Sequence, residues 1–176
     1  MKRAYAKRSS GTWPTGIGWP TCKAGLIKIG RPSSTVKAQR PRFDQITGTI
    51  PTELGNLAQM SEFDVFTNII TGPIPSEIGR LTSLTVLAMN ENQLTSTVPS
   101  ELGNLALLSV FSTYTNNMTG PIPSELGRLT KLIFLAMNEN QLTSTIPTEL
   151  GSLAELVFFS ACGNVMTGPI DRKSVV

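Results

Sequence analysis

Carboxylates at regular spacings are the side chains in this sequence that could do acid–base chemistry. Glu91 and Glu139 occupy the same place in two identical segments, 88–97 and 136–145. A second set of glutamates recurs at a constant spacing, at Glu53, Glu77, Glu101, Glu125 and Glu149. The 176-residue chain has no histidine, so it lacks the commonest general base and the commonest metal ligand. A carboxylate at the same site of every unit forms a ladder and not a converging acid–base pair. We therefore predict that the chain is not an enzyme and that it uses no cofactor and no metal.

The elements that must position these side chains follow from an internal repeat. An Ile-Pro or Val-Pro pair marks every unit, at Ile50-Pro51, Ile74-Pro75, Val98-Pro99, Ile122-Pro123 and Ile146-Pro147. Within a unit, apolar residues two positions apart, such as Leu87 and Met89, point to the same face of a short strand. One unit cannot bury its own apolar edge, so the stacking of neighbouring units must create the core. The period therefore predicts an α/β solenoid whose strands pair in parallel from one unit to the next.

The pattern LxxLxxLxLxxNxLTGxIPxELGxL, which about residues 43–170 follow, resembles the plant-specific class of leucine-rich repeat. That class occurs in receptor-like kinase ectodomains, in polygalacturonase-inhibiting proteins and in similar repeat proteins of algae. The resemblance implies a right-handed superhelix with parallel β-strands on the concave face and 3-10 or other short helices on the convex face. Ser96 and Ser144 stand where the pattern has glycine. This departure should cost little if the backbone there is extended.

Two recurring positions are predicted to be structural. An asparagine stands where the chain leaves each strand, so its side chain can satisfy backbone groups of the turn and of the adjacent unit. This ladder comprises Asn68, Asn92, Asn116, Asn140 and Asn164. A glycine closes each Glu-Leu-Gly sequence, or Glu-Ile-Gly in the second unit, at Gly55, Gly79, Gly103, Gly127 and Gly151. We expect this glycine to end a helical turn on the convex side.

Outward-facing strand residues form the candidate binding surface. Apolar residues in a contiguous exposed row and aromatic anchors are typical of interfaces. We predict that another protein or a peptide binds at Phe66, Val86, Asn90, Val110, Tyr114, Phe134, Asn138 and Phe158. The alternative interpretation is that these valines and phenylalanines reflect only the propensity of such residues for β-strands.

Charge divides the chain into segments of different kinds. Residues 1–42 contain ten Lys and Arg and no acid, whereas residues 43–176 contain five basic and 12 acidic residues, a net charge of −7. We predict a basic, disordered segment at 1–42, a half-repeat with five repeats at 43–170, and a short tail at 171–176. The basic segment is open to three interpretations: an organelle transit peptide, a site for anionic lipid or nucleic acid, or a tail without function. No nucleic-acid-binding motif accompanies it, which argues against nucleic acid as a partner.

Localisation signals are absent from the sequence: it has no apolar run long enough to span a bilayer and no secretory signal peptide. Because no capping repeat is recognisable at either end, we expect the chain to be part of a longer protein, whose missing parts would supply any membrane attachment. The leading hypothesis is a protein–protein interaction module that binds its partner through the concave face. The alternative, which the resemblance implies, is a ligand-sensing ectodomain fragment of a membrane receptor. In that case the chain is extracellular and Asn117, in Asn117-Met118-Thr119, is a glycosylation site.

Overall fold

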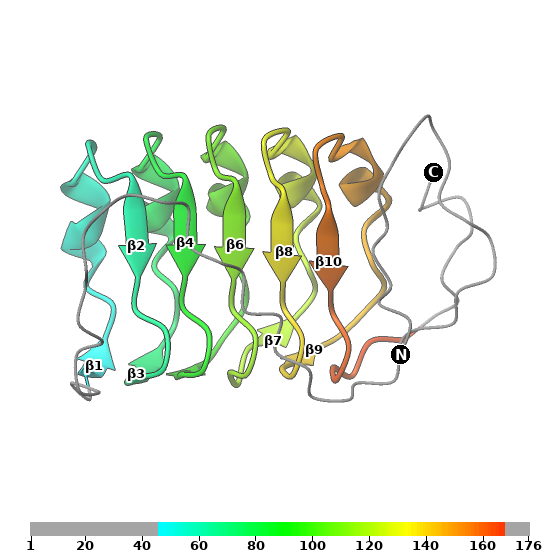
Figure 1. Ribbon diagram of the computed structural model, residues 1–176. Coiled ribbons are helices and arrows are strands. Elements are labelled where there is room, and N and C mark those ends of the chain that lie inside the picture. Colours follow the sequence, from blue (N-terminus) through cyan, green and yellow to red (C-terminus); the bar gives the residue numbers. More distant parts are fainter. Residues whose placement is uncertain (1–45, 168–176) are drawn as a thin grey trace, which may run out of the picture.

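Each repeat unit forms one coil of a solenoid in the computed structural model, which describes residues 46–167 (Figure 1). A coil consists of a short strand, a turn, a second extended segment and a 3-10 helix. The coils stack side by side in chain order, so each coil contacts the one before it and the one after it. The segments predicted at 1–42 and 171–176 lie outside the described residues.

Five parallel strands form the main sheet, in the order β2 (Glu62–Asp64), β4 (Val86–Ala88), β6 (Val110–Ser112), β8 (Phe134–Ala136) and β10 (Phe158–Ser160). Each residue pairs with its equivalent in the next coil, for example Val86 with Val110. A slip by one residue would turn the apolar side chains from the core to solvent, so their spacing sets this register. The predicted parallel sheet is confirmed. We call the solvent-facing side of these strands, and of the three residues after each strand, the strand face; it is the side predicted to be concave.

Shorter parallel pairings join the second extended segments of neighbouring coils. β1 (Thr47–Thr49), β3 (Ile69–Gly72) and β5 (Gln93–Leu94) form one sheet, and β7 (Thr119–Gly120) and β9 (Gln141–Leu142) form another. The sequence analysis did not predict these strands. β3 and β5 each contain a single buried residue, Ile70 and Leu94, so no pair of buried apolar residues two positions apart marks them in the sequence.

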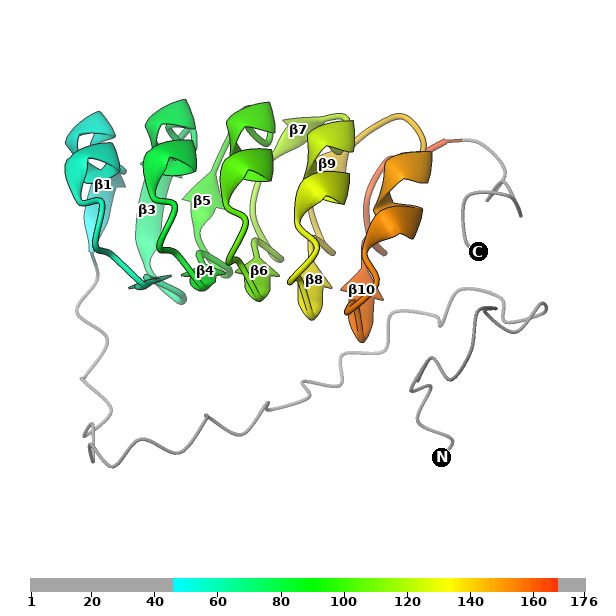
Figure 2. The same ribbon diagram turned by 90° about the horizontal axis from the view of Figure 1, so that it is seen from above.

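The 3-10 helices are η1 (Thr52–Asn56), η2 (Ser76–Arg80), η3 (Ser100–Asn104), η4 (Ser124–Arg128) and η5 (Thr148–Ser152). Each begins directly after the proline of the Ile-Pro or Val-Pro pair. Proline suits this place because its ring holds φ near the required value and the start of a helix needs no N–H from it. The helices lie on the side of the solenoid opposite the main sheet, as Figure 2 shows. This arrangement confirms the predicted convex side.

The core lies between the main sheet and the helices. Its fully buried side chains include Leu81, Leu84, Leu87, Met89, Leu105, Leu108, Phe111, Leu129, Leu132, Leu135 and Met137. Burial is weaker in the first coil, where Leu57 is 51% exposed. Among residues 46–167 no coil stacks on the outer side of Leu57, so a neighbour that would cover it is missing from the described part of the chain.

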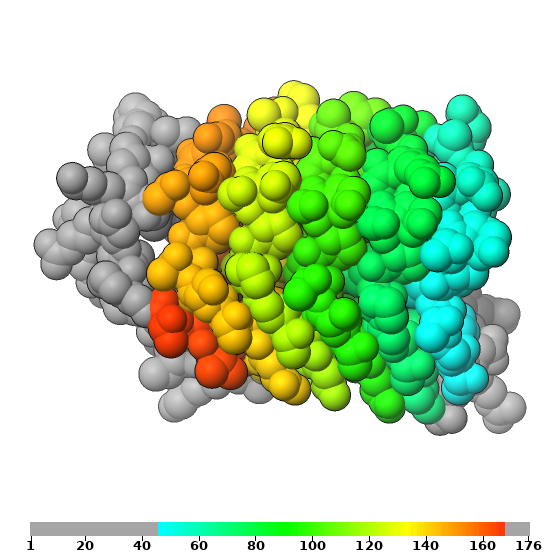
Figure 3. Space-filling view, turned by 180° about the vertical axis from the view of Figure 1, so that it is seen from behind, coloured from blue at the N-terminus to red at the C-terminus, as the bar shows by residue number. Residues whose placement is uncertain are grey.

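The glycines of Glu-Leu-Gly have a different role from the expected one. They lie inside the 3-10 helices, and the residue after each helix, such as Leu105, occupies the C-cap instead. A Cβ atom placed on Gly103 would lie 2.5 Å from the backbone oxygen of Glu125 in the next coil. Figure 3 shows from behind how closely the successive coils lie against one another. Glycine is therefore required for the close approach of the coils and not for ending a helix.

Ser96 and Ser144 do not have an extended backbone, which was the condition for a small cost. Their φ angles are 69° and 67°, in the left-handed region that favours glycine, and Gly120 has a φ of 74° at the corresponding place. A left-handed non-glycine residue costs on the order of 1–3 kcal/mol, so the departure from the repeat pattern is a strained one. The small cost, expected only for an extended backbone, therefore does not apply.

The same position accounts for one difference between the second and fourth coils, which have serine there, and the coils between them, which have glycine. A Cβ on Gly120 would lie 2.6 Å from Cγ2 of Thr97 in the preceding coil, and a Cβ on Gly72 would lie 2.9 Å from Cγ2 of Thr49. A threonine in one coil thus requires glycine in the next. Ser96 and Ser144 instead follow coils that have proline at the threonine position, at Pro73 and Pro121. The two kinds of coil therefore alternate.

Candidate binding surface

An apolar row crosses the strand face. The pairing of the strands places Val86, Val110, Phe134 and Phe158 side by side, and all four side chains are half-buried. The rings of Phe134 and Phe158 stack, with 4.6 Å between their centroids and an interplanar angle of 10°. Aromatic rings that are stacked in this way have already lost much of their side-chain freedom, so binding a partner costs little further conformational entropy. The row can therefore bury apolar surface against a partner.

A second row beside it consists of small residues, with Ala88, Ser112 and Ala136 in its centre. The hydroxyl of Ser112 donates a hydrogen bond of 3.2 Å to Oδ1 of Asn90. Asn90 is only 6% exposed. Because its side chain is buried and bonded to Ser112, we remove Asn90 from the predicted contact residues. Sequence spacing placed it on the outer face, but only the packing of the next coil reveals that it is covered.

A polar cluster surrounds Tyr114 where the chain leaves the strands. The Tyr114 hydroxyl donates to Oε1 of Glu91 at 3.0 Å, and the Thr67 hydroxyl donates to Oε2 of the same carboxylate at 3.0 Å. One coil further, the Thr115 hydroxyl donates to Oε2 of Glu139 at 2.8 Å. These contacts join residues of neighbouring coils. The sequence analysis named Tyr114 and the two glutamates but did not foresee that they form one cluster.

The backbone of this cluster is strained. Thr67, Glu91, Thr115 and Glu139 all have φ near 55°, in the left-handed region. Such residues persist where surrounding structure over-determines them, and they concentrate at functional sites. Here the backbone N–H of Glu91 donates to the carbonyl of Tyr114 at 2.9 Å, which ties each turn to the next coil. The carboxylates are therefore held in place before any partner arrives.

Tyr114 titrates above its ordinary range. Burial, the hydrogen bond to Glu91 and the negative charges of Glu91 and Glu139 together raise the pKa of Tyr114 to about 12. The folded protein thus holds this proton more tightly than the unfolded chain, in which tyrosine titrates near 10. The corresponding contribution to the free energy of unfolding is present below pH 10 and is lost as the pH rises from 10 to 12.

We expect spectrophotometric titration to detect this shift. The measurement uses a Tyr5→Phe background, because Tyr5 and Tyr114 are the two tyrosines of the chain. The tyrosinate absorbance should then appear with a midpoint near pH 12 and should move to lower pH when Glu91→Gln removes the charged acceptor. A midpoint close to 10 in the folded background protein would contradict the arrangement around Tyr114.

The remaining predicted contact residues differ in exposure. Phe66 follows β2, the edge strand of the main sheet, and its side chain is 49% exposed. Asn138 is half-buried. Glu62 and Asp64 lie on β2 at the same end. The strand face therefore has two parts: an apolar row towards β10, and an acidic region with aromatic residues from β2 to the Tyr114 cluster.

The asparagines of the ladder bond to backbone groups across coils. In Asn116, Nδ2 donates to the carbonyls of Met89 and Thr113 at 3.1 Å each, and Oδ1 accepts from the backbone N–H of Leu94 at 2.9 Å. The same pattern recurs at Asn92 and Asn140. Asn68 and Asn164, in the first and last coils described, also bond to backbone atoms and are less deeply buried. These side chains hold the turns together and are not directed at a partner.

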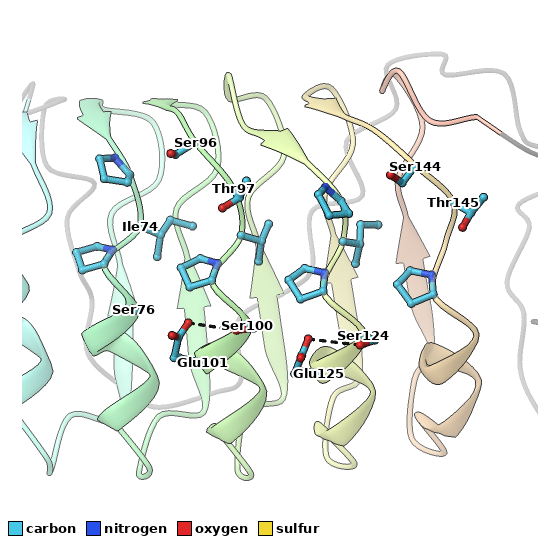
Figure 4. Close-up of a pocket in the computed structure, with 18 residues that line it drawn as sticks. Ile74, Ser76, Ser96, Thr97, Ser100, Glu101, Ser124, Glu125, Ser144 and Thr145 are labelled. Atoms are coloured by element: carbon cyan, nitrogen blue, oxygen red, sulfur yellow. Dashed lines mark hydrogen bonds between the residues drawn. The ribbon is translucent and has the colours of Figure 1, made fainter.

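An open groove of about 870 Å³ lies on the back of the solenoid, between the second extended segments and the 3-10 helices (Figure 4). Its floor is formed by prolines and by Ile74, Val98 and Ile122. The hydroxyls of Ser100 and Ser124 donate to the neighbouring carboxylates of Glu101 and Glu125 at 3.4 and 3.5 Å. These glutamates repeat once per coil, as the sequence indicated, and do not converge on a common point.

Residues 46–167 contain no group of three or more histidine, cysteine, aspartate and glutamate side chains that could hold a metal ion. None of the helices in that range is long and apolar enough to cross a membrane. Asn117 is exposed in the turn after Asn116.

Comparison with known proteins identifies the repeat. A family model described as Leucine Rich Repeat matches residues 83–105. A comparison with curated protein sequences gave no match. The solved structures that resemble this chain include the ectodomain of the Arabidopsis thaliana membrane receptor kinase GASSHO1/SCHENGEN3 in complex with CASPARIAN STRIP INTEGRITY FACTOR 2, at 39% identity and a TM-score of 0.72. That match covers 73% of this chain and 16% of the receptor ectodomain.

Two further structures are similar. The ectodomain of the Arabidopsis receptor kinase HAESA, in complex with an N-terminally extended IDA peptide hormone ligand, is 32% identical with a TM-score of 0.68, and the match covers 73% of this chain and 22% of that one. The BIR3–SERK2 complex from Arabidopsis thaliana is 30% identical with a TM-score of 0.62, over 72% of this chain and 66% of that one. The chain thus spans only a small part of the length of the GASSHO1/SCHENGEN3 and HAESA ectodomains.

Proposed function

Because this chain is a leucine-rich-repeat protein of the plant type, as in receptor kinase ectodomains, we propose that it binds another protein or a peptide through its strand face. The observation that carries the proposal is the row of Val86, Val110, Phe134 and Phe158, half-exposed and adjacent on a rigid parallel sheet. Contiguous exposed apolar residues mark interaction sites. Binding, and not catalysis, is the role that these side chains support.

The similar structures support this role. The GASSHO1/SCHENGEN3 structure is a complex with CASPARIAN STRIP INTEGRITY FACTOR 2, the HAESA structure is a complex with a peptide hormone, and the BIR3 structure is a complex with SERK2. In this chain the proposed contact residues are Phe66, Val86, Val110, Tyr114, Phe134, Asn138 and Phe158. The stacked pair Phe134 and Phe158 would be the energetic centre, because buried aromatic anchors dominate the free energy of most interfaces.

Affinity capture with the full chain tests the proposal. Phe134→Ala is expected to weaken binding of the captured partner by about tenfold or more, because it removes half of the stacked pair at an interface anchor. Leu107→Ala is the control, since Leu107 is also apolar and exposed but lies in the turn before β6. Circular dichroism verifies that both variants fold. Equal retention of the partner by the two variants would rule out the aromatic row as the binding site.

A second candidate is the ligand-sensing ectodomain piece of a membrane receptor. It is favoured by the similarity to extracellular parts of receptor kinases and by the exposure of Asn117. If the chain passes through a secretory pathway, glycosylation at Asn117 is expected. A gel-mobility shift upon treatment with a glycosidase, absent in Asn117→Gln, measures this. A protein from the native source that carries no glycan and is found inside cells would refute this candidate without affecting the first.

A further inference from the structure

We propose that the basic segment 1–42 of this chain docks on its own strand face, with cationic side chains against the carboxylates of Glu91 and Glu139. The inference rests on the proposed use of the strand face as a binding surface and names an occupant for its acidic region. Residues 1–42 supply ten Lys and Arg without a single acid. The segment would then compete with an outside partner for the same surface.

Charge complementarity is the first argument. The strands of the main sheet and the residues directly after them carry Glu62, Asp64, Glu91 and Glu139 but no Lys or Arg. On the opposite side, the five 3-10 helices carry five glutamates and two arginines, Arg80 and Arg128, a net charge of −3. Charges in water attract over about 8 Å at physiological ionic strength. The strand face therefore differs from the opposite side in having no cationic side chain that would repel a basic segment.

Preorganisation is the second argument. The carboxylates of Glu91 and Glu139 are each fixed by a threonine hydroxyl of the preceding coil, at 3.0 and 2.8 Å. Glu91 accepts a hydrogen bond from the Tyr114 hydroxyl at 3.0 Å, and Glu139 accepts one from the hydroxyl of the next residue, Thr115, at 2.8 Å. A lysine or arginine that enters beside Tyr114 meets two carboxylates whose positions are already set, and little ordering is required on the protein's side.

The cysteines are the third argument. Cys162 lies on the strand face directly after β10, and it is disulfide-bonded. Cys22, the other cysteine of the chain, belongs to the basic segment. We infer that these two are the partners. Two thiols form this bond by exchange with a small-molecule disulfide, which takes up both electrons and both protons and leaves as two thiols.

Tethering makes the contact within one chain favourable. The chain between Cys22 and the first described residue, Ile46, can span up to about 80 Å when it is extended. Five coils at the spacing of paired strands extend over only about 25 Å. A tethered segment acts at an effective concentration on the order of millimolar, so even weak ion pairs suffice for occupancy.

Zero-length carbodiimide cross-linking of the full chain, followed by peptide mapping, tests the proposal. Lysines of 1–42 are expected to be joined to Glu91 and Glu139, and the double variant Glu91→Gln/Glu139→Gln should reduce the total of lysine–strand-face cross-links at least fivefold. The matched control Glu101→Gln/Glu149→Gln, on the 3-10 helices, should leave that total unchanged. Without reductant, and with a disulfide buffer present, the digest should contain Cys22 joined to Cys162.

An equal mixture of isotopically light and heavy protein separates contacts within one chain from contacts between copies. Cross-links that join light to heavy chains, cross-links spread evenly over both sides of the solenoid, or a Cys162 that remains a thiol in the disulfide buffer would each overturn the proposal. The test is independent of the proposed function. Phe134→Ala removes no carboxylate, so the cross-links should persist in this variant if the docking is correct. If they persist and partner binding is also unchanged, the proposed function is refuted and the docking of the basic segment still stands.

Discussion

Replacing Asn116 with alanine is expected to lower the free energy of unfolding by about 3 kcal/mol, because it would leave one buried backbone N–H without its partner and remove one of the two hydrogen bonds that each of two backbone carbonyls accepts. Asn116 is 7% exposed and bonds to the backbone of its own turn and to that of the preceding coil. The N–H of Leu94 would be unsatisfied, which costs about 1–3 kcal/mol. The carbonyls of Met89 and Thr113 would each lose one hydrogen bond and keep another, from Asn92 and Asn140. Urea denaturation followed by circular dichroism measures the difference.

Asn117→Ala is the matched control for this substitution. Asn117 is the next residue along the chain, but its side chain is exposed, so a change within about 0.5 kcal/mol is expected. Asn164→Ala, in the last coil described, should fall between the two because Asn164 is less deeply buried than Asn116. A loss below about 1 kcal/mol for Asn116→Ala would mean that the ladder is not what holds the turns together.

Gly103→Ala is expected to destabilise the solenoid by about 3 kcal/mol, at the upper end of what overpacking usually costs. The added Cβ would lie 2.5 Å from the backbone oxygen of Glu125 and 2.8 Å from its Cβ. Most of what it meets is backbone, which cannot turn aside as a flexible side chain could. The coils that contain η3 and η4 must therefore separate, and the leucines packed between them lose contact.

Thermal unfolding and urea denaturation are the measurements for Gly103→Ala. Asn104→Ala is the control: it introduces the same side chain one position later in η3, at an exposed site. The control should change the midpoint very little. If the two variants unfolded at the same temperature, the close approach of neighbouring coils would have to tolerate a methyl group, and the explanation given for the glycines would fail.

The candidate site was partly accessible from the sequence. The spacing of the repeat is enough to place Val110, Phe134 and Phe158 in one row, because parallel strands in register put equivalent residues of successive units next to each other. The same reasoning predicted that Asn90 is an exposed contact residue. In the structure its side chain is buried and accepts a hydrogen bond from Ser112. The period of the repeat predicts only the face of the sheet on which a side chain lies. Whether that side chain is exposed depends also on the sizes of the neighbouring side chains, which the period does not give.

The sequence by itself determined the length of the coil and the parallel sheet, because a strict period allows one register that buries the recurring apolar positions of the inner coils. The side on which the helices lie followed from the resemblance to the leucine-rich repeat. Only the tertiary structure decided what depends on the distance between coils. Gly103 is required by a carbonyl of residue 125, Gly120 by a methyl group of residue 97, and Glu91 is held by hydroxyls of residues 67 and 114. Each of these contacts joins residues of neighbouring coils, far apart in the chain, and their geometry is set by how tightly the leucines let the coils stack.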